Sequence, residues 1–340
     1  MWYNGERCEA KEKIGGITVI EVKNLVKKYG DHVAVNDLSF NIEKGKIYGF
    51  LGPNGAGKST TMNIITGYLA PTSGEVVVNG HNIYDEPEAA KKCIGYLPEI
   101  PPVYLEMTPK EYLEFSADLK GIKRSERQKM IDEVVELAGI KDVYNRLIKN
   151  LSKGYRQRVG VAQAIIGYPE IIILDEPTVG LDPKQIMEMR DLIRGLAKKH
   201  TVILSTHIMQ EVSALCDEVL IIAHGELIAK DTPDNLSKHV SGSNTLELMV
   251  KAPDYKVKAI LSKVSDVSKF EVVDSEEDGI TKVFVSSSAD KDVRENVFYA
   301  FATAKCPIVS MQYSSLSLED VFIKVTEGKQ TDRRKRKEAK

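Results

Sequence analysis

One short stretch of the chain has the residue types and spacing that hold phosphate groups. Residues 52–59 read GPNGAGKS, follow the apolar segment KIYGFL and precede the helical pattern TTMNIITGYL. They fit the pattern G-x-x-x-x-G-K-[ST], in which glycines turn backbone N–H groups toward phosphate oxygens and a helix N-terminus adds positive charge. In this pattern Lys58 contacts the β- and γ-phosphates and Ser59 binds Mg²⁺. The stretch therefore predicts a site for a nucleoside triphosphate.

A pair of carboxylates supplies further groups that phosphate chemistry needs. Asp175 and Glu176 follow the apolar run IIIL at 171–174. Ligands of α/β folds bind at the carboxyl ends of the strands, so both acids are expected at that edge. Asp175 is suited to Mg²⁺, and Glu176 can polarise the attacking water, because phosphoryl transfer depends mainly on positioning and charge stabilisation. Two acids after a strand are more often a solvated turn, but the phosphate-binding stretch favours the chemical interpretation.

A third segment links the chain to a known family. Residues 151–158 read LSKGYRQR and resemble the signature segment of ATP-binding cassette (ABC) ATPases. Further motifs occur in the family's order, namely the phosphate-binding stretch, ILDEPT at 173–178, the LD pair at 181–182 and His207. The resemblance covers roughly residues 17–235. It implies a P-loop ATPase that binds ATP and Mg²⁺.

The resemblance assigns one half of a nucleotide site to the chain that binds the ATP. The implied contacts are Tyr29, Asn54, Gly55, Ala56, Gly57, Lys58, Ser59 and Thr60. Tyr29 matches the aromatic residue that stacks on adenine, and Thr60 matches the hydroxyl near the α-phosphate. His207 matches the switch histidine that senses the γ-phosphate. The implied catalytic residues are Lys58, Glu176 and His207.

The other half of the site is implied to come from a second copy of the chain. Ser152 is well placed to cap a helix that begins at the signature, and Gly154 leaves its backbone exposed. Such a helix start can offer donors to the γ-phosphate bound by the opposite protomer. Asp182, in the sequence GLDP, matches the loop that crosses the dimer interface. A homodimer with ATP between its protomers follows from this resemblance.

One position departs from the common family pattern. In IGYLPE at 94–99 the chain has Glu99 where the family usually has glutamine, at the residue that links Mg²⁺ to the membrane partner. A carboxylate attracts the metal more strongly than an amide does. The implied metal contacts are therefore Ser59, Asp175 and Glu99. This substitution, the signature and SLEDVF at 317–322 resemble the gliding-motility and multidrug (daunorubicin-resistance-type) exporter subgroup.

The elements that must position these residues predict an α/β module over residues 17–240. Short β-branched runs alternate with helical patterns, which is typical of a largely parallel, buried sheet. A helical subdomain at about 108–168 interrupts this alternation. Its first helix is predicted from Thr108, Pro109 and Glu111, the residues of a capped N-terminus, and a later helix is predicted to stop near Gly139.

A smaller α+β module is predicted over residues 241–327. Its elements are strand 245–250, helix 255–264, strand 270–274, strand 281–287, helix 293–304 and strand 308–314. The order β-α-β-β-α-β is typical of a ferredoxin-like fold. Residues 1–16 are expected to form a flexible arm and residues 328–340 a basic, disordered tail.

Composition and charge exclude several classes of protein. The 340 residues carry 47 Lys and Arg against 49 Asp and Glu, so bulk charge does not hold the chain on nucleic acid. The N-terminus lacks the apolar run of a secretory signal, and the longest apolar stretches are too short to span a bilayer. The four cysteines are scattered, without zinc or disulfide spacing. These features favour a reducing cytoplasm.

The preferred interpretation is the ATPase subunit of an ABC exporter. It would drive a separate membrane permease through ATP-dependent dimerisation, on the cytoplasmic face of the membrane. The permease is expected to dock near Glu99 and residues 100–112, where PPVYLEM is apolar and aromatic. The alternative is a soluble ABC-type ATPase that acts on ribosomes or nucleic acid, although the chain has one P-loop and no sustained heptad insertion. A ligand-sensing role for the smaller module also remains open.

Overall fold

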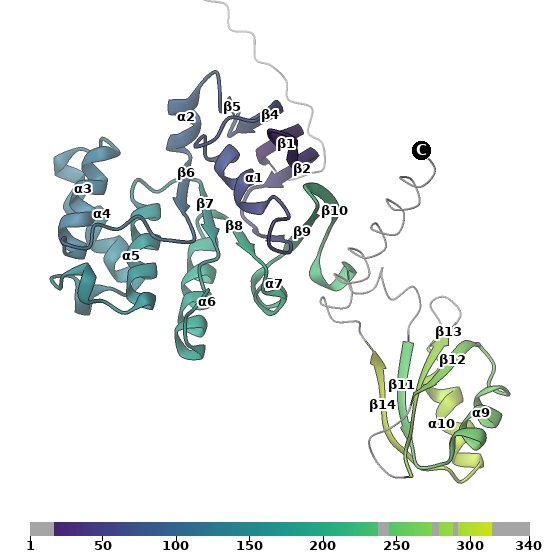
Figure 1. The fold of residues 1–340 in the computed structure, drawn as a ribbon. Coiled ribbons are helices and arrows are strands. Elements are labelled where there is room, and N and C mark those ends of the chain that lie inside the picture. Colours follow the sequence, from purple (N-terminus) through teal and green to yellow (C-terminus); the bar gives the residue numbers. More distant parts are fainter. Residues whose placement is uncertain (1–16, 237–244, 274–278, 288–291, 315–340) are drawn as a thin grey trace, which may run out of the picture. The chain divides into compact units, whose positions relative to one another are not determined.

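The computed structural model describes residues 17–236, 245–273, 279–287 and 292–314, which form parts of two compact units (Figure 1). The units are Met1–Lys230 and Asp231–Lys340. The predicted N-terminal arm, the basic tail and the SLEDVF segment lie outside the described residues. Within the described ranges, no helix is long and apolar enough to span a bilayer.

A six-stranded sheet forms the centre of the first unit. Its strand order is β10-β9-β3-β8-β7-β6. The strands are β3 (Ile47–Leu51), β6 (Ile94–Leu97), β7 (Ile171–Asp175), β8 (Thr201–Thr206), β9 (Glu218–Ala223) and β10 (Glu226–Asp231). The pairs of β3 with β8 and β9, and of β7 with β6 and β8, are parallel. Every residue of β3, β7 and β8 is buried, as expected for parallel strands covered on both faces.

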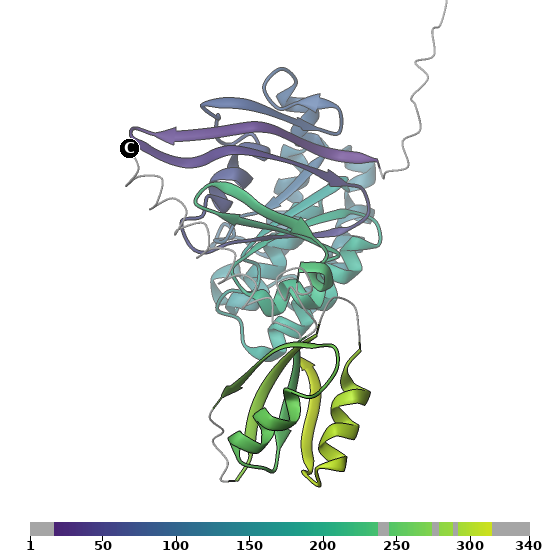
Figure 2. The same ribbon diagram turned by 90° about the vertical axis from the view of Figure 1, so that its right-hand side faces the viewer.

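An antiparallel sheet adds a second layer to this unit, and Figure 2 shows its two long strands at the top of the view. Its order is β2-β1-β4-β5, with β1 (Thr18–Tyr29), β2 (His32–Glu43), β4 (Ser73–Val78) and β5 (His81–Asn82). Phe40 of β2 packs against Phe50 of β3 with ring centroids 5.6 Å apart, so both sheets share one core. The β1–β2 turn carries Tyr29 toward the nucleotide site described below.

Helices occupy the connections of the central sheet. Between β6 and β7 lie α3 (Pro109–Leu119), α4 (Arg124–Ala138) and α5 (Lys153–Ile165), which form the predicted helical subdomain (Figure 1). The side chain of Thr108 accepts a hydrogen bond from Glu111 N, and the carboxylate of Glu111 accepts one from Thr108 N, so the expected capping box is present. The other α-helices described in this unit are α1 (Lys58–Ile65), α2 (Pro87–Lys92), α6 (Pro183–Ala197) and α7 (Met209–Leu215).

The second unit has the β-α-β-β-α-β order that its sequence predicts. Its elements are β11 (Thr245–Val250), α9 (Asp254–Leu261), β12 (Val267–Val273), β13 (Thr281–Ser287), α10 (Arg294–Thr303) and β14 (Ile308–Ser314). The antiparallel strand order β12-β13-β11-β14 is that of a ferredoxin-like sheet. Leu246 and Leu248 of β11 pack with Phe301 of α10 in a core separate from that of the first unit.

Candidate functional site

The phosphate-binding loop joins β3 to α1. Gly55 and Gly57 have φ of 79° and 101°, in the left-handed region that favours glycine. A Cβ on Gly57 would lie 2.5 Å from the carbonyl oxygen of Ala34, so the neighbouring strand also requires glycine there. Lys58 begins α1, and its Nζ donates to the carbonyl of Gly52 at 2.7 Å. The loop therefore has the backbone that a bound phosphate needs, with a cation at its end.

Burial sets the electrostatics of Lys58, which is 7% exposed. Burial lowers the pKa of its ammonium group, whereas the charges of Glu176, Asp175 and Glu99 act in the opposite direction. A desolvated cation among carboxylates is a strong partner for an anionic ligand, because a phosphate replaces the lost hydration.

A pocket of about 540 Å³ opens beside this loop and collects most of the predicted nucleotide contacts. Its lining residues are Tyr29, His32, Ala34, Asn54, Gly55, Gly57, Lys58, Ser59, Thr60, Glu99, Glu176, Val179 and His207. Ala56 and Asp175 lie behind this surface and are each 3% exposed. Three of these lining residues, His32, Ala34 and Val179, were not predicted from the sequence. His32 pairs with Tyr29 across the β1–β2 hairpin, and the Gly30-Asp31 turn is the signal that could have found it.

The carboxyl ends of β7 and β8 bring Glu176 and His207 together. The strands are parallel with Asp175 opposite Ser205, so the residues that follow each strand are neighbours. Glu176 has φ of 49°, and its amide donates to the carbonyl of Ser205 at 2.8 Å, which holds this uncommon backbone in place. Glu176 Oε1 lies 2.8 Å from His207 Nδ1. The arrangement places a carboxylate and an imidazole at one side of the pocket.

Asp175 has the properties expected of a magnesium ligand. Its Oδ1 is buried and has no hydrogen-bond partner among the residues that the structure describes. A buried carboxylate oxygen without a donor is costly, and a cation offsets that cost. Mg²⁺ is usually held by one or two carboxylates together with substrate phosphates and water, and Ser59 and Glu99 line the same pocket. The residues present therefore fit a magnesium nucleotide.

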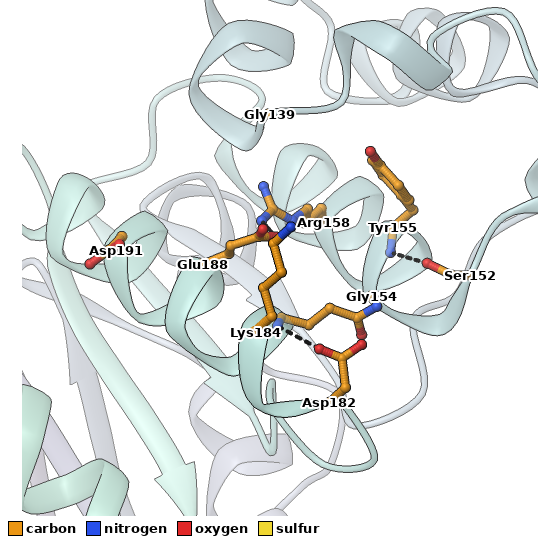
Figure 3. A pocket seen from close by; sticks show the side chains of 10 residues that line it. Gly139, Ser152, Gly154, Tyr155, Arg158, Asp182, Lys184, Glu188 and Asp191 are labelled. Carbon is orange, nitrogen blue, oxygen red and sulfur yellow. Dashed lines mark hydrogen bonds and ion pairs between the residues drawn. The ribbon is translucent and has the colours of Figure 1, made fainter.

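The signature residues line a different pocket, of about 590 Å³, between α5 and α6 (Figure 3). Ser152 caps α5 by accepting a hydrogen bond from Tyr155 N at 3.3 Å, as its sequence predicts. Asp182 caps α6 by accepting from Gln185 N at 2.9 Å. Gly154 is buried, which corrects the expectation that its backbone is exposed. The side chain of Gln185 lies against it, and a Cβ on Gly154 would lie 2.7 Å from the end of that side chain. Ser152, Gly154 and Asp182 thus gather away from the nucleotide pocket of their own chain.

The chain is similar to ABC transporter proteins. The family model "ABC transporter" matches residues 35–179. The chain is 36% identical over 313 residues to the bacitracin transport ATP-binding protein BcrA of Bacillus licheniformis, which covers 92% of this chain and 98% of that protein. It is 31% identical over 309 residues to the linearmycin resistance ATP-binding protein LnrL of Bacillus subtilis (strain 168), with 91% and 98% covered.

Solved structures share the fold of the first unit. The ATP-binding subunit of an ABC transporter superposes with a TM-score of 0.60 at 31% identity, covering 66% of this chain and 94% of that one. The cassette MJ0796, as a dimer in a post-hydrolysis state with ADP and Pi, gives 0.57 at 27% identity, with 63% and 98% covered. Together with the extensive match to BcrA, these similarities show that the chain belongs to the ABC transporter family, as an ATP-binding and ATP-hydrolysing subunit.

Proposed function

We propose that the nucleotide pocket binds magnesium ATP in the orientation set by its walls. Tyr29 stacks on adenine, and the loop from Asn54 to Gly57 surrounds the phosphates together with Thr60. Lys58 contacts the β- and γ-phosphates. Ser59, Asp175 and Glu99 hold the metal, which neutralises phosphate charge when bound. The observation that carries this proposal is the unpartnered, buried Oδ1 of Asp175 beside a pocket lined by Lys58 and Glu176.

Glu176 acts as the general base in this proposal. Its carboxylate takes a proton from the water that attacks the γ-phosphorus, while His207 beside it contacts the γ-phosphate. His207 is half-exposed at the pocket and Glu176 is almost fully buried, so the imidazole can reach the ligand while the base stays fixed. The bond between the γ-phosphorus and the oxygen that bridges it to the β-phosphate breaks, and ADP and phosphate then leave.

A second copy of the chain completes the site. Ser152 and Gly154 offer the N-terminus of α5 to the γ-phosphate of the partner's nucleotide, and Asp182 lies at the same surface. Their separation from the nucleotide pocket of their own chain supports this arrangement. The dimeric MJ0796 cassette is a related protein that assembles in pairs. ATP then links two protomers, and hydrolysis allows them to separate.

A membrane permease is the proposed partner of the dimer. Ile100, Tyr104 and Leu105 are 82%, 54% and 46% exposed close to Glu99 in the chain, which suits an apolar docking surface. The ring of Tyr104 contacts Phe115 of α3 with centroids 5.6 Å apart, which ties this surface to the helical subdomain. The named relatives are transport and resistance proteins, which favours a peripheral exporter subunit on the cytoplasmic face over a ribosome- or DNA-directed ATPase.

ATP turnover by the purified chain tests this proposal. The wild type should release phosphate from magnesium ATP, and Glu176→Gln should lower kcat at least about 100-fold, the usual contribution of a general base. Binding of a fluorescent ATP analogue should change little in that variant. Turnover by Glu176→Gln at the wild-type rate would assign the base to another residue.

A further inference from the structure

A second carboxylate lies behind Glu176 and has no role in the function proposed above. Glu211 is in the first turn of α7 and is 1% exposed. Glutamate is rarely buried to this degree unless its charge is paired or its proton is retained. Val212 and Leu215 of the same helix are buried apolar residues, so Glu211 occupies part of a face that would otherwise be apolar. Its burial therefore needs a specific cause.

Two threonine hydroxyl groups contact the Glu211 carboxyl group. Thr178, after β7, donates to Oε1. Thr206, at the end of β8, places its Oγ1 3.4 Å from Glu211 Oε2 and 3.3 Å from Glu176 Oε2. The amide of Ile208 donates to the same Oγ1 at 3.1 Å, which fixes the hydroxyl between the two carboxyl groups. The Thr206 hydroxyl is thus the direct link from Glu211 to the proposed base.

Counting protons gives this link a direction. A threonine hydroxyl carries one proton and cannot donate to two carboxylates at once. When Glu211 carries a proton on Oε2, Glu211 donates to Thr206, and Thr206 donates to the ionised Glu176. Burial raises the pKa of Glu211, and the charge of Glu176 acts in the same direction. The hydrogen bonds with Thr178 and Thr206 and the charge of Arg190 act in the opposite direction, and the net shift is upward. When Glu211 is protonated, the Thr206 hydroxyl and the two carboxyl groups beside it can therefore all form hydrogen bonds.

We propose that Glu211 is a positioning residue for ATP hydrolysis, which orients the carboxylate of Glu176 through the hydroxyl of Thr206. The inference rests on the role proposed for Glu176. His207 Nδ1 lies 2.8 Å from Glu176 Oε1, and Thr206 contacts Glu176 Oε2. Both carboxylate oxygens of Glu176 are therefore held by hydrogen bonds only when the Thr206 contact is present. Catalytic groups need positions fixed by such supporting contacts, since small displacements of a base cost much of its rate contribution.

Substitutions at Glu211 and Thr206 test whether Glu211 orients the Glu176 carboxylate or only fills space in the protein interior. Glu211→Ala should lower kcat about tenfold, the scale of losses at supporting contacts, and leave the KM for ATP within about twofold. Glu211→Gln should retain kcat within about threefold, because its amide N–H group can donate to Thr206 as the protonated acid does. Thr206→Val should resemble Glu211→Ala, and Thr206→Ser should resemble the wild type. The double variant Glu211→Ala/Thr206→Val should be no slower than either single variant.

The Glu176→Gln variant serves as the reference for these measurements. If it hydrolyses ATP at the wild-type rate, the role of Glu176 fails whatever the Glu211 variants do. With Glu176 established, the inference is overturned if Glu211→Gln is as slow as Glu211→Ala, if both retain the wild-type kcat, or if the KM for ATP rises as kcat falls. If Glu211→Ala does not fold, Thr206→Val and Thr206→Ser decide: equal kcat values for these two variants also overturn the inference.

Discussion

Replacing Gly154 by alanine should leave the stability of one protomer nearly unchanged and should impair the site that two protomers share. The added Cβ would lie 2.7 Å from Cδ and Oε1 of Gln185. These atoms are the end of a flexible side chain that can turn toward solvent at small cost. Alanine in place of a helical glycine gains about 0.5–1 kcal/mol, so the free energy of unfolding should stay within about 1 kcal/mol of the wild type.

The same methyl group should strongly reduce turnover. Gly154 lines the pocket proposed to receive the γ-phosphate of the partner's ATP, in the first turn of α5. Alanine keeps its backbone N–H group, but its methyl group would hold the partner's γ-phosphate away from the backbone donors of α5. Loss of one such contact to a developing negative charge costs about 100-fold in kcat. We therefore expect ATP hydrolysis by Gly154→Ala to fall about 100-fold, while the affinity of a single protomer for ATP is retained.

Three measurements on matched variants check this expectation. Phosphate release gives kcat, fluorescent nucleotide titration gives the affinity, and urea unfolding gives the stability. Gln185→Ala alone and the double variant Gly154→Ala/Gln185→Ala serve as controls, because the double variant removes the obstacle inside the protomer. If the double variant regains the wild-type kcat, strain between α5 and α6 explains the loss, and the assignment of Gly154 to the partner's nucleotide is refuted.

Three further predictions address single side chains. Glu99→Gln should retain ATP hydrolysis, measured by phosphate release, and complete loss of turnover would show that Glu99 does more than hold the metal. Tyr29→Ala should weaken ATP binding about tenfold by titration, whereas Tyr29→Phe should not, because stacking needs only the ring. Burial lowers the pKa of Lys120 from 10.5 to about 8, so the unfolded chain binds more protons between these pH values and stability rises with pH there. The free energy of unfolding of wild type relative to Lys120→Met should therefore increase from about pH 8 to 10.5; a flat difference contradicts this.

The sequence predicted helix ends well where capping residues or a glycine mark them. The capping residues Thr108 and Glu111 mark the start of α3, and Gly139 ends α4 with φ of 63°, because these residues act on the backbone next to them. The strand β12 is less well predicted: it begins at Val267 instead of 270. It is an edge strand whose half-buried and exposed side chains alternate only over residues 270–273. The register shifts between Val267 and Lys269, so the first residues of the strand lack the alternation that marks a half-buried strand.

Long-range pairing explains what the sequence did not predict. The antiparallel sheet joins β1 to β4, with Ile20 opposite Val78, and no local pattern identifies such distant partners. The site shows the same limit. Motifs located Lys58 and Glu176, whereas the burial of Glu211 depends on the meeting of α7 with the loop after β7 and with the end of β8. Individual residues were predictable where a backbone pattern marks them, but their buried supports were not.

The mass of Glu176→Gln in solution with saturating magnesium ATP tests the central claim most directly. This variant binds ATP without hydrolysing it in the proposed mechanism, so the nucleotide should hold two chains together. Light scattering should then give twice the 37.8 kDa of one chain, and adding Gly154→Ala should return the mass to one chain. A mass of 37.8 kDa for Glu176→Gln, with ATP binding verified in the same sample, would contradict a site shared by two protomers.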